Sequence, residues 1–150
     1  MRAVIQRVNS ASISVNNKVV TGIKKGLVIF LGVLRGDGSR DVEYLAKRIA
    51  QLRIFNDRAR KMNQCLKDTG GQLLVVSQFT LCAELSDSGR RPSFERAEKP
   101  KTAEKLYLEF IQQLKDFQIK VEQGIFKEYM TVHIENDGPV TFILDTEKER

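Results

Sequence analysis

The sequence predicts a single α+β domain, in which two main helices accompany a curved or barrel-like, mostly antiparallel sheet. Short runs rich in β-branched residues recur along the chain, and two separated segments carry apolar residues at helical spacing. No linker, repeat or low-complexity segment divides the 150 residues. This length suits one domain, residues 1–150, with one sizeable core.

The first third of the chain is predicted to form short strands. Residues 2–8 and 11–15 are rich in β-branched side chains, and Asn16-Asn17 is a good tight-turn pair before residues 18–23. Residues 27–34 are almost continuously apolar, which indicates a strand that is buried on both faces.

Two segments are predicted to be helices. Ser39 or Asp41 is expected to cap the first, and Pro100 and Thr102 mark the start of the second. The expected buried stripes are Val42, Leu45, Ala46, Ile49 and Leu52 in the first helix, and Ala103, Leu106, Tyr107, Phe110, Ile111 and Leu114 in the second.

The remaining strands are expected at residues 72–76, 129–135 and 140–144. Residues 129–135 alternate between apolar and polar side chains, so Met130 and His133 should face opposite sides. Asn136-Asp137-Gly138-Pro139 consists of turn residues and predicts a hairpin turn. Residues 147–150 are expected to be a frayed, charged tail.

Composition narrows the functional classes. The apolar content of 41% and the charged content of 29% fit an ordinary soluble protein, and no apolar run is long enough to cross a membrane. We therefore expect a cytoplasmic protein without a membrane partner. Cys65, Cys82 and the single His133 do not form a metal-binding pattern, so no metal or cofactor is expected. The net charge of +6 favours polyanionic partners such as RNA.

Ser77-Gln78-Phe79-Thr80 is the first candidate for chemistry. It follows a buried strand, and loops at strand ends often carry function because the scaffold beneath them is rigid. Three of its side chains form hydrogen bonds, and Phe79 offers a face for stacking. The pattern alone favours the simpler interpretation, a polar strand exit with a core phenylalanine.

Two further segments leave alternatives open. Asn136-Asp137-Gly138-Pro139 is either an ordinary turn or a binding loop, and composition gives no reason to expect a cis bond there. Arg90 and Arg91 could bind phosphates as planar forks. They could equally pair with Glu84, Asp87 or Glu95.

Several segments, taken in order, resemble the D-aminoacyl-tRNA deacylase family over the whole chain. The segments that carry the resemblance are Met1–Val8, Leu52–Phe55, Lys61–Asn63, Ser77–Leu81, Gly89–Phe94 and Asn136–Thr141. One departure is Lys127-Glu128, which replaces small residues expected at that point and affects the expected shape of the loop.

The resemblance implies a homodimer with two active sites near the subunit interface. Each pocket would receive the 3′-terminal aminoacyl-adenosine of tRNA, and Ser77, Gln78, Phe79 and Thr80 match the segment that lines it. Met130 matches another pocket position. Gly138-Pro139 matches a chiral filter with a cis peptide bond that reaches the partner's active site, and Arg7 matches a residue that holds this filter.

A filter made of backbone can select a D-amino acid by shape. Two carbonyl oxygens placed against the substrate α-carbon leave room for a hydrogen atom and exclude an L side chain. Glycine has no side chain, so glycyl-tRNA should also be hydrolysed. Hydrolysis could use Thr80 as a nucleophile, or the 2′-hydroxyl of the tRNA with backbone N–H groups near Phe79 and Thr80. We favour the second route. The rival functions are a noncatalytic RNA-binding module and a hydrolase of another small ester.

Overall fold

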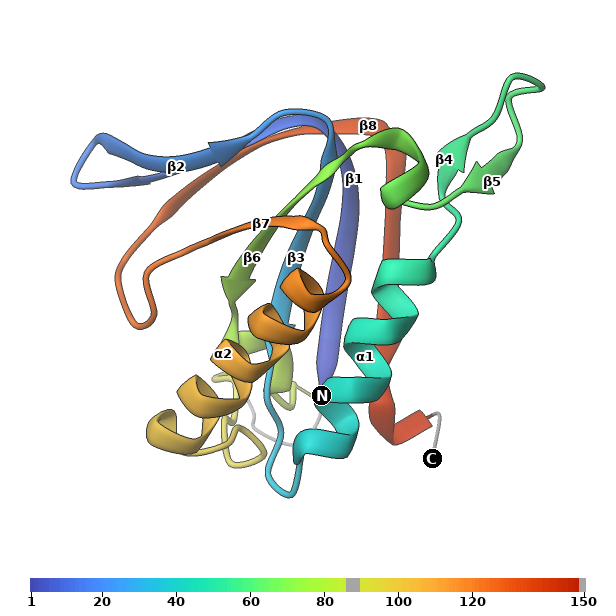
Figure 1. Ribbon diagram of the computed structural model, residues 1–150. Helices are drawn as coiled ribbons and strands as arrows, with labels where there is room; N and C mark the ends of the chain where they lie inside the picture. The colour runs from blue at the N-terminus through green and yellow to red at the C-terminus, as the bar shows by residue number, and fades with distance from the viewer. Residues whose placement is uncertain (86–89, 149–150) are drawn as a thin grey trace.

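The computed structural model describes residues 1–85 and 90–148. In this part of the chain a six-stranded sheet carries two helices on one face (Figure 1). The main sheet contains β1 (Arg2–Val15), β2 (Lys18–Ile23), β3 (Gly26–Gly32), β6 (Gln72–Ser77), β7 (Lys120–Gln123) and β8 (Thr131–Asp145). A small hairpin contains β4 (Phe55–Asn56) and β5 (Met62–Gln64). The helices are α1 (Ser39–Gln51) and α2 (Pro100–Asp116), with 3-10 turns η1 (Lys67–Thr69), η2 (Phe79–Cys82) and η3 (Thr146–Lys148).

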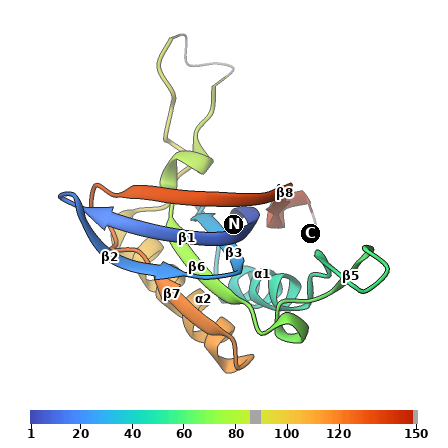
Figure 2. The same ribbon diagram turned by 90° about the horizontal axis from the view of Figure 1, so that it is seen from above.

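Strand β1 organises the sheet. It pairs antiparallel with β8 along one edge, and with β3 and then β2 along the other. Strands β6 and β7 extend the sheet from β3 in parallel. Strand β2 curls back toward β7, where the Thr21 hydroxyl donates to Glu122 Oε2 at 3.0 Å. The sheet is therefore a nearly closed, barrel-like surface (Figure 2), as the sequence predicted.

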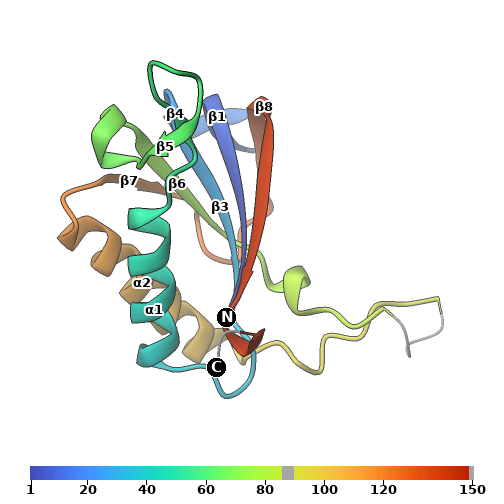
Figure 3. The same ribbon diagram turned by 90° about the vertical axis from the view of Figure 1, so that its right-hand side faces the viewer.

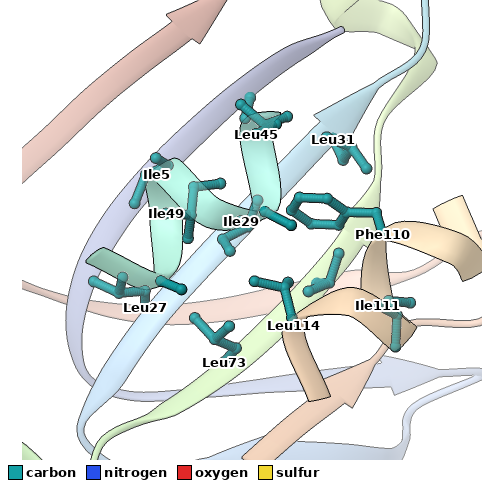
Figure 4. Packing of buried hydrophobic residues seen from close by; sticks show 14 of the residues in the cluster. Ile5, Leu27, Ile29, Leu31, Leu45, Ile49, Leu73, Phe110, Ile111 and Leu114 are labelled. Carbon is teal, nitrogen blue, oxygen red and sulfur yellow. The ribbon is translucent and has the colours of Figure 1, made fainter. Parts of the chain in front are cut away.

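Both faces of strand β3 are buried, which explains its continuous apolar sequence. Leu27, Ile29 and Leu31 belong to the core that α1 and α2 cover (Figure 4). Val28 belongs to a second core, which lies on the other face of the sheet. In β6, likewise, Leu73 and Val75 belong to the first core, and Leu74 and Val76 belong to the second. Both helices lie on one face of the sheet (Figure 3), and the opposite face curls around the second core.

The predicted helices are present, but the start of α1 differs. Gly38 is the N-cap residue, and its N–H donates to the Asp41 carboxylate at 3.0 Å. Asp41 therefore acts from the third helical position, and Ser39 is already inside the helix, so neither residue is the cap. Helix α2 begins at Pro100, whose missing N–H costs nothing in a first turn.

Three predictions about the strands were wrong, and one strand of the main sheet was not predicted. Residues 2–15 form one strand that bends near exposed Asn9 and Ser10. Strand β3 ends at Gly32, two residues early. Strand β7 was not predicted, because Lys120–Gln123 is short and its polar side chains lack clear alternation. Residues 136–139 lie inside the single strand β8 and do not reverse the chain.

The C-terminal segment is ordered as far as it is described. Thr146 is buried, and Glu147 Oε1 pairs with Arg96 Nη2 at 2.5 Å. The predicted fraying is therefore wrong for residues 147 and 148, and residues 149–150 lie outside the described part. No helix within residues 1–85 and 90–148 has the length and apolar character needed to span a membrane.

Candidate functional site

The first candidate segment leaves the sheet where β6 ends. Ser77 pairs with Leu31 in the ladder, and the Gln78 N–H donates to the Leu31 carbonyl at 2.8 Å. Turn η2 begins at the next residue, Phe79. The first N–H groups of such a turn have no partner inside it, so those of Phe79 and Thr80 can serve a ligand.

Turn η2 is held against the end of β3. A Cβ atom on Gly32 would lie 2.9 Å from Cys82 Sγ and 3.1 Å from the Gln78 carbonyl, so only glycine permits this approach. Arg2 Nη1 donates to the Leu81 carbonyl at 2.8 Å. Cys82 is a free, buried thiol, and burial raises its pKa. The backbone of the candidate segment is thus fixed by its neighbours.

A cavity of about 740 Å³ opens beside this segment. It lies between the ends of β3 and β6, the start of α2 and the loop before β8. Its apolar lining comes from Leu31, Val33, Val76, Phe79, Phe94, Ala97, Pro100, Ala103, Phe126, Tyr129, Met130 and Val132, and its polar lining from Arg35, Ser77, Gln78, Glu98, Lys99, Lys127 and Glu128. A mostly apolar cavity with a few polar groups is the usual form of a small-molecule site.

Exposed aromatic rings form part of the cavity lining. Phe79 is 57% exposed and its ring centre lies 5.0 Å from that of Phe94, with the planes tilted by 56°. Tyr129, which also belongs to the lining, is 93% exposed. The interpretation of Phe79 as a core residue is therefore wrong. Exposed rings at a cavity provide faces on which a nucleobase can stack.

Thr80 contacts its own segment. Gln78 Nε2 donates to Thr80 Oγ1 at 2.5 Å, so this contact places a donor, and no proton acceptor, at the Thr80 hydroxyl. His133 lies on the face of β8 opposite to Met130 and Val132, which line the cavity. The structure therefore separates the single histidine from Thr80.

The second candidate segment is an insertion within β8. In the β1–β8 ladder Gln6 pairs with Thr141 and Val8 pairs with Asn136, so β8 carries three extra residues at this point. The Asn136 amide donates to the carbonyls of Arg7 and Val140, at 2.8 and 3.2 Å. These bonds close the insertion. The Gly138-Pro139 peptide bond is cis, as the family resemblance implied, and Gly138 has φ of 119°.

Arg7 lies directly beneath this insertion. The residue is 6% exposed, and its Nη1 donates to the Ile54 carbonyl at 2.6 Å. Its Nε lies 2.9 Å from Asp137 Oδ2, but the N–H is not directed at that oxygen, so the contact is an ion pair without a directed hydrogen bond. Arg7 thus connects the insertion to the start of the β4–β5 hairpin.

The structure does not bring the two candidate segments together within one chain. Ser77 is level with Leu31 and Ala3 in the sheet, whereas Arg7 is level with Leu27 and Leu73. Four residues along a strand correspond to about 13 Å. Ser77, Gln78, Phe79 and Met130 line the cavity, whereas Arg7, Gly138 and Pro139 lie toward the other end of the strands.

Sequence reasoning missed part of the cavity lining. Phe126 and Tyr129 come from the loop before β8, and the start of α2 contributes Lys99 and Pro100. Their sequence positions gave no signal, because only the fold brings these loops to the end of β6. Lys127 and Glu128, the departure from the family pattern, also line the cavity.

The basic segment is only partly described. Arg90 and Arg91 are exposed, whereas Asp87 and Gly89 lie outside the described residues. Glu84, one of the predicted partners, lies 3.7 Å from Arg96 and its backbone pairs with Ser93. Within residues 1–85 and 90–148, no group of three His, Cys, Asp or Glu residues is placed to hold a metal ion.

Known proteins resemble this chain along its whole length. A profile of the family described as D-Tyr-tRNA(Tyr) deacylase matches residues 4–145. Proteins named D-aminoacyl-tRNA deacylase are similar, one from Syntrophotalea carbinolica with 52% identity over 148 residues and one from Thermosipho melanesiensis with 51% over 149. Each alignment covers 99% of both chains.

Solved structures give the same fold. One titled "c-Myc DNA Unwinding Element Binding Protein" is 36% identical, has a TM-score of 0.89 and covers 97% of this chain and 98% of its own. A second, titled as a probable eukaryotic D-amino acid tRNA deacylase, has a TM-score of 0.83 at 17% identity, covers 95% and 97% of the two chains, and supports the fold alone. The family match over almost the whole sequence and the relatives near 50% identity settle the assignment. The chain belongs to the D-Tyr-tRNA(Tyr) deacylase family.

Proposed function

We propose that this chain hydrolyses the ester bond of D-aminoacyl-tRNA and rejects L-aminoacyl-tRNA at a site built from two copies of the chain. The family assignment supports the ester hydrolysis. The observation that carries the two-chain arrangement is the separation of the cavity from Gly138-Pro139 within one chain. A second copy related by two-fold symmetry would present its Gly138-Pro139 to this cavity, and this chain would do the same in return.

In the proposed complex the cavity holds the 3′-terminal adenosine with its amino acid. The exposed rings of Phe79 and Phe94 offer stacking faces, and the apolar lining receives the amino-acid side chain. The partner's backbone carbonyls approach the α-carbon and exclude an L side chain by shape. Arg7 and the Asn136 amide support this backbone from below, which keeps the filter rigid.

Hydrolysis in this proposal relies on positioning. The tRNA 2′-hydroxyl orients the attacking water, and the N–H groups at the start of η2 stabilise the negative charge that develops on the ester oxygen. An aminoacyl ester is already labile, so orientation supplies much of the required acceleration. Thr80 then fixes the geometry of η2 through Gln78 and does not act as a nucleophile.

The substitution Thr80→Ala separates the two roles of this hydroxyl. We expect the variant to retain most of the turnover of D-Tyr-tRNA in a single-turnover release assay, because the backbone donors remain. A decrease of a thousandfold or more, the scale on which removal of a covalent nucleophile acts, would establish Thr80 as the nucleophile.

Release of amino acid from D-Tyr-tRNA, L-Tyr-tRNA and glycyl-tRNA by the unmodified protein tests the proposed function. We expect release from the D-tyrosyl and glycyl substrates and none from the L-tyrosyl substrate. Equal release of both tyrosine enantiomers would disprove the filter.

Binding of nucleic acid without catalysis is the second candidate. It is favoured by the solved structure that is described as a DNA unwinding element binding protein and is 36% identical to this chain. Binding of tRNA with no release from any of the three substrates would support it in place of hydrolysis.

A further inference from the structure

The tip of the β4–β5 hairpin forms a rigid basic projection. Residues 57–61 join the two strands at the tip of the hairpin, which projects away from the helices (Figure 1). Arg58, Arg60 and Lys61 are all exposed. The Asp57 carboxylate accepts the N–H groups of Ala59 and Lys61 at 2.8 and 3.0 Å. Two backbone bonds between Asp57 and residues 60 and 61 close the turn further. A fixed backbone therefore presents three cations to solvent.

The basic surface continues beside the hairpin. A hollow of about 550 Å³ lies between the end of α1, η1 and the segment after α2. Arg48, Arg53 and Lys67 line it, and Phe117 adds a ring that is 37% exposed. We call the six cations Arg48, Arg53, Arg58, Arg60, Lys61 and Lys67 the hairpin-side basic surface.

These six cations are not used to stabilise the fold through ion pairs. None takes part in the ion pairs formed within residues 1–85 and 90–148, whereas Arg2, Arg7 and Arg96 all do. Of the two acids close to them, Asp57 accepts the N–H groups of Ala59 and Lys61, and Asp68 accepts the N–H of Cys65. Hydrogen bonds from Cys65 are the main cause of the lowered pKa of Asp68, and the charge of Arg53 lowers it further. Lys67 Nζ donates to the neutral Gln118 Oε1 at 3.2 Å. The surface is therefore available to an anionic partner.

The hairpin lies next to the Gly138 insertion, and this position indicates which anionic partner it meets. Arg7 joins the Gly138 insertion to Ile54, the residue immediately before β4. The tip lies a few residues further, about 10–13 Å along an extended chain. The hairpin accordingly lies beside the filter and at the other end of the strands from its own cavity.

We infer that the hairpin-side basic surface binds phosphates of aminoacyl-tRNA. The 3′ end of that tRNA lies in the cavity of the partner chain, to which this chain supplies Gly138-Pro139. The inference rests on the proposed function. In the proposed dimer, RNA that enters one chain's cavity lies next to the Gly138-Pro139 of the other chain. It therefore also lies next to that other chain's hairpin, which is beside Gly138. Basic surfaces of this kind bind phosphates without reading sequence, and such binding weakens as salt rises.

The test compares two double variants of equal charge. Arg58→Gln/Lys61→Gln removes two cations from the tip and leaves Arg60, whose φ of 60° belongs to the turn, in place. Lys18→Gln/Lys105→Gln removes two exposed lysines from the start of β2 and from α2. Fluorescence anisotropy with uncharged tRNA gives the dissociation constant as a function of salt concentration.

We expect the tip variant to bind tRNA more weakly than the control variant. Its plot of log affinity against log salt should be shallower by about 0.7–0.9 for each phosphate that the tip no longer binds. Its kcat/KM on D-Tyr-tRNA should also fall, while it hydrolyses D-tyrosyl-adenosine, which lacks the tRNA body, at the unmodified rate.

Two failures can be told apart. Equal tRNA affinity and salt dependence in the tip and control variants would overturn this inference, whether or not the protein is an active deacylase. Absence of hydrolysis by the unmodified protein would overturn the proposed function, whereas the binding comparison would still decide whether the tip contacts tRNA.

Discussion

At the scale of single residues, backbone geometry carries more of the proposed selectivity than side-chain chemistry. Gly32 has no side chain, so η2 can pack closely against the end of β3. Gly138 has φ of 119°, a backbone conformation that other residues rarely adopt. The family resemblance placed Gly138-Pro139 at a functional site, but turn composition alone suggested a hairpin turn. The side chains of Arg7 and Asn136 support this backbone from positions that are distant in the sequence.

The substitution Gly138→Ala tests whether this backbone is needed. A Cβ atom there would lie 2.7 Å from Val140 Cγ2 and 3.3 Å from Arg7 Nη2, and positive φ adds strain. We expect a cost of about 1–3 kcal/mol in urea unfolding and a loss of selective D-Tyr-tRNA hydrolysis. Gly38→Ser is the control, because the Gly38 backbone is extended, nothing lies within 4 Å of a Cβ atom there, and serine suits the N-cap position. Unchanged selectivity in Gly138→Ala would remove this residue from the filter.

Asp145 should make stability depend on pH. Burial raises the pKa of this carboxyl, but hydrogen bonds from Arg2 Nε, at 2.9 Å, and the Glu147 N–H outweigh burial, so the pKa is lowered. A lowered folded-state pKa stabilises the protein above the unfolded-state pKa of about 3.9, and this stabilisation is lost as pH falls through the folded-state pKa.

Asp145→Asn should therefore lower the free energy of unfolding by about 1.5–3 kcal/mol at pH 7. The difference from the unmodified protein should shrink as pH falls below about 4. Exposed Asp116→Asn provides the control, with a change within about 0.5 kcal/mol. A difference for Asp145→Asn that is constant from pH 7 to pH 3 would contradict the assigned pKa direction.

At the scale of elements, the long-range pairings determine where the site forms. The helical stripes of α1 and α2 and the buried runs of β3 and β6 could be predicted, because periodicity reports which side chains are covered. Strand β7 and the insertion in β8 could not be predicted. Lys120–Gln123 forms a strand because it pairs with β6. Asn136–Pro139 remains within β8 because the residues of β8 before and after this insertion both pair with β1.

The close approach of β3 to β6 gives a prediction at this scale. A Cβ atom on Gly26 would lie 1.9 Å from the Gln72 carbonyl oxygen, an atom that the β-ladder fixes. Gly26→Ser should therefore cost about 3 kcal/mol or more in urea unfolding, since backbone cannot move aside as a side chain can. The same substitution at Gly38, the N-cap of α1, should be neutral or slightly stabilising. Equal stability of the two variants would refute the close approach.

At the scale of the whole molecule, the proposed site is shared between two chains. The position of Ser77, Gln78 and Phe79 after a buried strand made them candidates, but only the family resemblance favoured a functional role over an ordinary strand exit. Tyr129 and Phe126 could not be identified from the sequence at all. The register of the sheet then explains why the cavity and the filter are separate. The cavity of one chain is complete in the proposal only when another chain supplies Gly138-Pro139.

Mixing of two damaged chains tests this sharing most directly. Phe79→Ala alters the cavity at an exposed side chain, and Gly138→Ala alters the filter. Each pure variant should hydrolyse D-Tyr-tRNA slowly, Phe79→Ala because its own cavity is altered, and Gly138→Ala because its displaced backbone no longer completes the cavity of the partner chain. After unfolding and refolding together in equal amounts, half of the dimers contain one chain of each kind, and each such dimer has one intact cavity facing one intact filter. We predict activity of about a quarter of the unmodified protein. Activity no higher than the average of the two pure variants would contradict the shared site.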